Sequence, residues 1–338
     1  MGKTNFTAPA PARFRKARIV VGYPLNGGTA YHFSGASHYD IHTGEYLILE
    51  VGKPLPSNAQ PIPVSDSIGF TMRQGIPVLI ERLFLHRNIE ICLIPYANSA
   101  NTITPDGSGL YDGEYRFLSR TSLEELKLYI DQTPVMGSHN GGDFFRRAYH
   151  LLNETEKDGY EYYLLDIMPS PYTLSTVINF EEGAKPTKED IFKFYLGYGD
   201  MAKMDTNRSL FQLFNNQTGK IDWDLYDSFE NNYGVFTMVA SKGNSAGTGA
   251  AIGNGVVDEL SLGYAQYFAE LISRLDVKCF HIVCDGFTPE TQKAGMKSAF
   301  GISASDIGHI WFDAATSGEF LSAVNRIALS ILEELRVG

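Results

Sequence analysis

The stretch Ile68–Tyr96 reads IGFTMRQGIPVLIERLFLHRNIEICLIPY and joins two kinds of apolar pattern. Its first part, residues 68–85, carries apolar side chains at helical spacing despite Pro77. Its second part, Ile89–Tyr96, is an almost continuous apolar run of the length of a buried strand. A helix followed directly by a strand that is buried on both faces is typical of an α/β protein with a parallel sheet.

The same alternation continues on both sides of this stretch. The runs Glu45–Val51 (EYLILEV) and Tyr160–Asp166 (YEYYLLD) predict two more buried central strands. Towards the C-terminus, a helix over Val256–Leu275 precedes predicted strands at Lys278–Cys284 and His309–Phe312. We therefore expect an α/β fold with a doubly wound, mostly parallel sheet and helices on both faces. In such sheets the ligand or partner surface lies at the carboxyl ends of the strands.

The two ends of the chain differ in character. Residues 1–17 carry four basic side chains and no acid, contain several alanines and prolines, and predict a disordered basic arm. Thr316-x-x-Glu319 is a capping-box pattern ahead of an apolar stripe that runs to Leu335, and it predicts a closing helix. Between these ends we expect a single α/β domain, residues 18–338, with an aromatic-rich insertion at about residues 167–240.

Composition excludes several classes of protein. The formal net charge of −11 argues against a dedicated nucleic-acid binder, which normally presents a basic face. The sequence contains no stretch of about 18 consecutive apolar residues, so we expect no membrane insertion. The three cysteines, Cys92, Cys279 and Cys284, each lie in an apolar strand-like run. Buried thiols of this kind favour a reducing compartment, and we expect a cytoplasmic protein.

Several segments together resemble a von Willebrand factor A (vWA) domain. The run Glu45–Val51 and the helix that follows it are similar to the family's first strand and first helix, and Ile89–Asn98 is similar to its second strand. Residues 117–152 are similar in layout to the family's next helices and their Gly-rich turn. The later strands and helices match as well, so that the resemblance covers residues 45–166 and 256–337.

The resemblance implies a divalent-cation site, the metal-ion-dependent adhesion site of the family. That site uses an Asp-x-Ser-x-Ser turn, a Thr and a further Asp, because hard cations prefer oxygen ligands. Here the turn after residue 49 keeps only the acid, Glu50, lacks both hydroxyls, and carries a positive charge beside the site at Lys53. Asp166 and Ser170 are the remaining candidates for the third loop. We therefore expect a degenerate site and no cofactor, with Mg²⁺ as the ion that Glu50, Asp166 and Ser170 would hold.

A serine hydrolase is the alternative from another class. Gly243-Asn244-Ser245-Ala246-Gly247 fits the G-x-S-x-G turn that exposes a nucleophilic serine between a strand and a helix. Asp285, after the strand-like run 278–284, is the candidate acid. A base must follow in the chain, and His309 precedes the last predicted strand when it should follow it. The catalytic set is therefore incomplete at its histidine.

Three further patterns carry weaker hypotheses. Gly247–Ala251 resembles the phosphate loop of tubulin-like GTPases, but no N-terminal nucleotide strand accompanies it. His38, Asp40 and His42 share one face of a strand, as zinc ligands could, but we favour the solvated face of a hairpin as the explanation. Cys284 would be a nucleophile only if its pKa were depressed.

The sequence therefore favours a non-catalytic function. We expect a protein–protein interaction scaffold or an assembly subunit of a larger complex, with protein partners or copies of itself. Its contact surface would combine the loops at the strand carboxyl ends with the aromatic insertion, because aromatic side chains are enriched at protein interfaces.

Overall fold

A computed structural model of the chain describes residues 13–49, 53–97, 100, 115–135, 139–155, 159–172, 174–178, 214–215, 220–221, 235–239 and 255–337. Its centre is a sheet of five parallel strands in the order β13-β12-β7-β2-β6. These strands are β2 (Lys16–Pro24), β6 (Ile89–Tyr96), β7 (Tyr160–Met168), β12 (Lys278–Cys284) and β13 (Trp311–Ala314). The predicted doubly wound α/β fold is confirmed.

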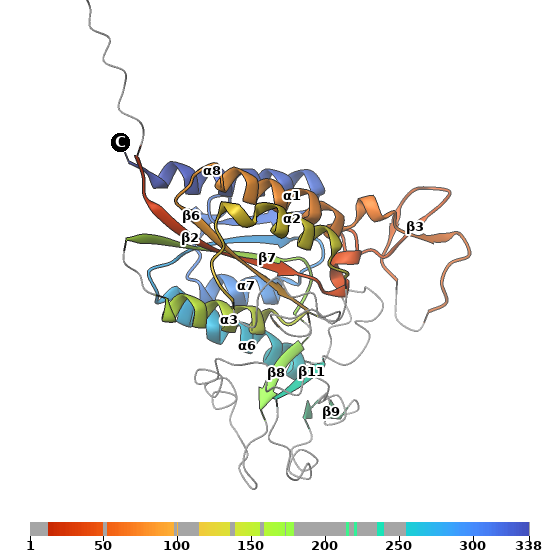
Figure 1. The fold of residues 1–338 in the computed structure, drawn as a ribbon. Coiled ribbons are helices and arrows are strands. Elements are labelled where there is room, and N and C mark those ends of the chain that lie inside the picture. The colour runs from red at the N-terminus through yellow and green to blue at the C-terminus, as the bar shows by residue number, and fades with distance from the viewer. Residues whose placement is uncertain are drawn as a thin grey trace, which may run out of the picture.

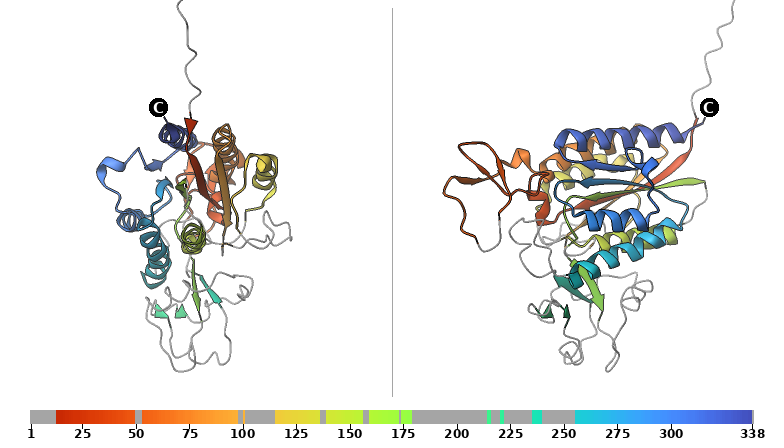
Figure 2. Two further views of the ribbon diagram at one scale, coloured as in Figure 1. Left: turned by 60° about the vertical axis from the view of Figure 1, so that its left-hand side comes forward. Right: turned by 180° about the vertical axis from the view of Figure 1, so that it is seen from behind.

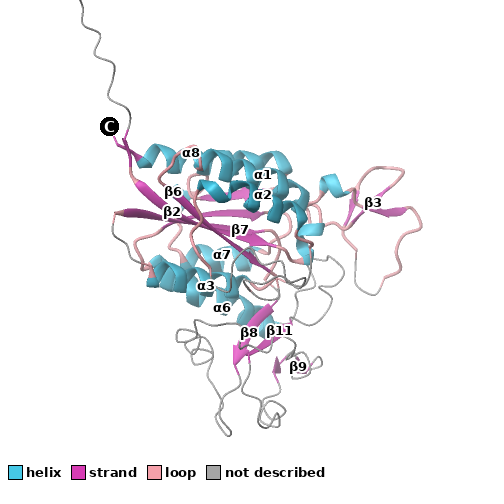
Figure 3. Ribbon diagram, in the orientation of Figure 1, coloured by secondary structure: helices cyan, strands magenta, loops and turns pink. Residues whose placement is uncertain are grey.

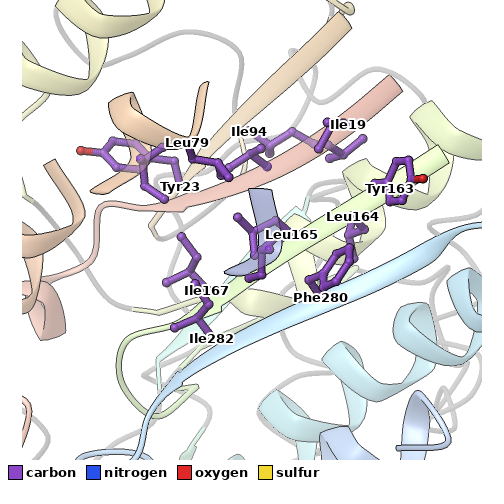
Figure 4. Close-up of a cluster of buried hydrophobic side chains, with 14 of the residues drawn as sticks. Ile19, Tyr23, Leu79, Ile94, Tyr163, Leu164, Leu165, Ile167, Phe280 and Ile282 are labelled. Carbon is purple, nitrogen blue, oxygen red and sulfur yellow. The ribbon is translucent and has the colours of Figure 1, made fainter. Parts of the chain in front are cut away.

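Helices cover both faces of this sheet (Figure 1, Figure 3). One layer consists of α1 (Ile68–Leu83), α2 (Leu123–Gln132) and α8 (Ser317–Leu335). The other consists of α3 (Gly141–Glu154), α6 (Gly255–Ser273) and α7 (Glu290–Ala299). Aliphatic side chains from neighbouring strands fill the space between the sheet and the helices, among them Ile19, Ile94, Leu165 and Ile282 (Figure 4).

The first strand of the sheet is β2, and the prediction that Glu45–Val51 is a buried central strand is wrong. Within that run the described strand is β4 (Tyr46–Leu47), which belongs to a small antiparallel sheet with β3 (His38–Asp40) and β5 (Ala59–Pro61). Tyr46 and Ile48 are 41% and 52% exposed. The apolar run is not buried because no helical layer covers it, whereas β2 has helices on both faces (Figure 1).

The small sheet belongs to a β-lobe, residues 31–66 without the undescribed 50–52, which projects from the carboxyl edge of the central sheet (Figures 1 and 2). Its place in the chain is the connection between β2 and α1. His32 stacks on Tyr46 with ring centroids 3.7 Å apart, and the Tyr46 hydroxyl donates to Asp66 at 2.9 Å. These contacts hold β4 against the base of the lobe.

The opposite edge of the sheet holds the two ends of the folded body. β1 (Arg13–Phe14) pairs antiparallel with β14 (Arg336–Val337), and β2 begins at Lys16, so four residues of the predicted arm, 13, 14, 16 and 17, lie in strands. Residues 1–12 lie outside the described part. The closing helix forms as predicted: the Thr316 side chain accepts a hydrogen bond from the backbone N–H of Glu319 at 3.2 Å.

The regular alternation is interrupted after β7. β8 (Leu174–Ile178) and β11 (Val235–Val239) pair antiparallel, and β9 (Phe214–Asn215) pairs with β10 (Lys220–Ile221). The alternation resumes with α6 at Gly255. The insertion expected at about residues 167–240 falls in this interval, whose other residues are largely outside the described part.

Candidate functional site

The chain reverses its direction of winding between β2 and β7. After β2 it passes to β6 on one side, and it then crosses to β7 on the other side of β2. In open α/β sheets this switch point leaves a crevice outside the carboxyl ends of the two strands, where ligands bind. The residues that follow β2 and β7 are therefore the first candidates for a functional site.

In this protein the two loops at the switch point bond to each other. The Asn26 amide, after β2, donates to the Ser170 hydroxyl, after β7, at 2.7 Å, and both residues are buried. Gly28 packs so closely against the pair that an added Cβ would overlap the Ser170 side chain and come within 2.7 Å of Asn26 Nδ2. The hydroxyl of Ser170 is thus engaged inside the protein, and no side chain could occupy the Gly28 position without a shift.

His139 completes this cluster from the segment before α3. Its Nδ1 lies 2.8 Å from the Ser170 carbonyl oxygen and 3.2 Å from that of Pro171, so this nitrogen carries the proton and donates. Burial lowers the pKa of His139 from 6.5 to about 4, although the two carbonyls favour the charged form. The imidazole is therefore neutral at pH 7 and acts as a bridge between loops.

A buried ion pair fixes the start of α3 beside the cluster. Asn140 caps the helix by accepting from the Asp143 N–H, and Asp143 pairs with Arg146 at 2.9 Å. Asp143 also accepts from the backbone N–H of Ala100 at 2.5 Å. Burial opposes ionisation of Asp143, but Arg146 and Arg147 hold its pKa below the usual value. The pair ties α3 to the loop after β6.

The residues predicted as metal ligands make different contacts. Asp166 lies inside β7 and pairs with His281 of β12 at 3.2 Å, whereas Ser170 bonds to Asn26. Glu50 lies outside the described residues. Across the described ranges no group of three or more His, Cys, Asp or Glu side chains is arranged to hold a metal ion. The set Glu50, Asp166 and Ser170 therefore stays a prediction.

The described part of the chain does not bring the candidate residues of the hydrolase together. Ser245 lies outside it, and Asp285 forms an ion pair with Lys293. Asp285 follows β12 and His309 precedes β13, and these strands are parallel, so the two residues lie at opposite edges of the sheet. Burial raises the pKa of Cys284 far above its ordinary value, which removes it as a thiolate nucleophile.

Of the three residues of this cluster, Ser170 was predicted as a metal ligand, whereas Asn26 and His139 were not predicted as site residues. Asn26-Gly27-Gly28 had the pattern of a turn, and His139 had the pattern of a Gly-rich loop. A usable signal was present in the polar residues that directly follow the strand-like run Arg18–Leu25. The prediction that residues 45–51 form a central strand instead places the switch point after residue 51, away from Asn26.

Comparison with known proteins defines the class of this fold. No family model matches the chain, and none of the curated proteins matches it. Among solved structures, the PilB minor pilin from Streptococcus sanguinis is similar with a TM-score of 0.55, at 13% identity over 96% of this chain. The pilus adhesin SpaC from Lactobacillus rhamnosus GG, in its open conformation, is similar with a TM-score of 0.51, at 10% identity over 95% of this chain.

The chain spans 64% of the length of the PilB structure and 30% of that of SpaC. The vWF domain of the type V pili tip protein Mfa5 from Porphyromonas gingivalis aligns over 96% of this chain and 98% of its own, at 10% identity and a TM-score of 0.48. The protein has a vWA-like fold, as the sequence resemblance predicted.

These comparisons also correct the expected location. The prediction of a cytoplasmic protein is contradicted, because the structures that share the fold are a minor pilin and a pilus adhesin. The prediction rested on free, buried cysteines. A thiol that is buried in the core carries no information about the compartment, since it is protected from oxidants wherever the protein is located. Across the described residues, no helix has both the length and the apolar character needed to cross a membrane.

Proposed function

We propose that this protein is a non-catalytic subunit of a pilus-type surface assembly and that it acts in adhesion or assembly through protein–protein contacts. The observation that carries the proposal is the likeness of nearly the whole chain to a minor pilin and a pilus adhesin. At the identities involved the likeness establishes the fold alone, so the role is our inference.

The chemistry of the switch point supports a non-catalytic role. The polar groups that an enzyme of this fold would direct at a ligand are here bonded to one another: Asn26 to Ser170, and Ser170 to His139. Nucleophilic catalysis requires a nucleophile within reach of a base that a third group orients. Within the described residues, Asp285 and His309 lie too far apart to act on one serine.

The β-lobe provides surface for contacts with partners. Ile41, Ile48, Leu55 and Val64 are exposed on it, at the edge of the sheet where α/β proteins bind their ligands. Four exposed apolar side chains in one small lobe offer apolar surface of the kind that protein–protein contacts bury. The lobe is therefore the surface through which we expect adhesion or assembly.

The location and the contacts are tested in the native host. Antibodies raised against the folded chain should label intact cells, and crosslinking on the cell surface should join the chain to other surface proteins. Labelling that requires permeabilised cells would overturn the surface role. A fluorophosphonate probe should leave the chain unmodified. Labelling that disappears in Ser245→Ala would instead establish the hydrolase.

A further inference from the structure

The outer edge of β4 is open for pairing with another strand. β4 pairs with β3 through His38–Leu47 and Tyr39–Tyr46, and Asp40 N–H donates to the Glu45 carbonyl at 2.9 Å. Because inward and outward backbone groups alternate along an antiparallel strand, those of Tyr46 face outwards, and those of Ile48, the residue directly after the strand, face the same way when the strand is extended by one more pair. Within the described part of the chain, no residue bonds to these groups.

The other edge of the same small sheet is closed. β5 pairs with β3 on its inner side, where Ile62 N–H donates to the Ser37 carbonyl. By the same alternation its outward groups belong to Ala59 and Pro61. The Ala59 N–H already donates to the Pro56 carbonyl at 3.0 Å, and proline has no N–H. Proteins block sheet edges with proline in this way, and residues 46–49 contain no proline.

The chemistry around β4 selects the kind of strand that would pair with it. Residues 46–49 (YLIL) are apolar, and Glu45 and Glu50 flank them in the sequence. If two β4 edges paired with each other, in either direction, a glutamate of one copy would lie opposite a glutamate of the other, and like charges across strands repel. Residues 31–66 contain four acids and one lysine. A strand that carries a basic residue at one end and contains no acid is the complement.

The chain contains such a segment in residues 3–8 (KTNFTA), which lie outside the described residues. The segment starts with Lys3, contains no acid or proline, and is long enough to cover residues 46–49. It precedes β1, which lies at the opposite end of the molecule from the β-lobe (Figures 1 and 2). The segment of one copy is therefore placed to reach the lobe of the next.

We propose that the open edge of β4 binds residues 3–8 of a second copy by strand addition, with Phe6 packing on the exposed Tyr46 and Ile48. Main-chain hydrogen bonds supply the affinity in this mode of recognition, and side chains supply the specificity. Such a contact joins two different surfaces, so it builds open head-to-tail chains and not closed dimers. The inference rests on the proposed assembly function and names the contact between copies.

Sedimentation of the full-length chain over a concentration series tests this contact. The average mass of the wild type should rise with concentration and fall back at high salt, which screens the charge complementarity. Ile48→Pro removes the outward N–H and should stay monomeric, whereas Ile48→Val keeps both the N–H and an apolar side chain and should associate like the wild type. Phe6→Asp, which changes only the added segment, should also stay monomeric.

Mixing the two deficient variants provides the strictest test. Ile48→Pro keeps an intact segment 3–8, and Phe6→Asp keeps an intact β4 edge. An equimolar mixture should therefore form one-to-one pairs, and it should not form chains of three or more copies. A wild type that is monomeric at every concentration would overturn the inference, as would Phe6→Asp associating normally or a mixture that stays monomeric. Because Phe6 is outside the lobe, its outcome holds even if Ile48→Pro unfolds β4. A monomeric chain that still labels at the cell surface would leave the proposed function standing.

Discussion

Gly28 is the residue on which the closure of the switch-point crevice depends. A Cβ at this position would overlap Ser170 and approach Asn26 Nδ2 to 2.7 Å. We expect Gly28→Ala to lower the free energy of unfolding by about 1–3 kcal/mol, the usual cost of overpacking. Chemical denaturation measures this change.

Gly318→Ala is the matched control for that substitution. Gly318 lies in the first turn of α8, and the nearest atom to its added Cβ is 4.0 Å away. We expect its stability to be unchanged or slightly higher, because alanine restricts the unfolded chain more than glycine does. Equal losses in both variants would contradict the tight packing inferred at Gly28.

His139 makes stability depend on pH. Its pKa is about 4 in the folded protein and 6.5 when unperturbed. As pH falls below 6.5 the unfolded chain takes up this proton and the folded chain does not, so stability is complete above that pH and declines towards pH 4. The difference between the two pKa values corresponds to about 3 kcal/mol.

Denaturation at a series of pH values tests this prediction. His139→Asn keeps a donor for the Ser170 carbonyl and removes the titrating group. The free energy of unfolding should therefore fall by about 3 kcal/mol less between pH 6.5 and pH 4 than it does in the wild type. His32 and His86 also have lowered pKa values because of burial, so part of the decline should remain. A variant with the full wild-type slope would contradict the assignment to His139.

At the scale of single elements, the start of α8 shows a local pattern deciding local structure. Thr316 accepts from the Glu319 N–H, and the Glu319 carboxylate accepts from the Ala315 N–H at 2.7 Å. We expect Thr316→Ala to cost about 1 kcal/mol of unfolding free energy, the typical value of an N-cap. Thermal or chemical denaturation measures it, and Thr316→Ser, which keeps the acceptor, should retain the wild-type stability.

In the β-lobe, by contrast with the start of α8, the local sequence does not decide the structure. Residues 46–49 are as apolar as a central strand, yet the structure leaves Tyr46 and Ile48 exposed. β2, which contains Lys16 and Arg18, is instead an interior strand of the main sheet, between β7 and β6. A short apolar run does not reveal whether a helix will cover it, because burial depends on elements elsewhere in the chain.

For the whole molecule, the predicted metal ligands Glu50, Asp166 and Ser170 can be tested by adding or removing Mg²⁺. Asp166 is paired with His281, and Ser170 is bonded to Asn26, so neither described candidate is arranged towards a shared ion. We expect millimolar Mg²⁺ or EDTA to leave the melting temperature unchanged, because a ligand raises it only by binding the folded state. A rise with Mg²⁺ that Ser170→Ala abolishes would restore the metal-site hypothesis.

The molecule also has distinct poles. β1 and β14 hold the two ends of the folded body at one edge of the sheet, and the β-lobe extends from the other (Figure 2). Arg15 reinforces the first edge through Glu161 and the Glu334 carbonyl, at 2.6 Å for the latter. This separation is what allows one copy to contact the next without using the same surface twice.

The sequence by itself determined the α/β class, the parallel sheet and the closing helix. These follow from the alternation of helical and strand periods and from the cap at Thr316, which are local properties of the chain. The tertiary structure alone decided that β2 lies inside the sheet between β7 and β6, that residues 45–49 lie in an exposed lobe, and that Asn26, Ser170 and His139 meet. Burial and contact depend on segments distant in sequence, and the spacing of residues in one segment does not encode which of the others will cover it.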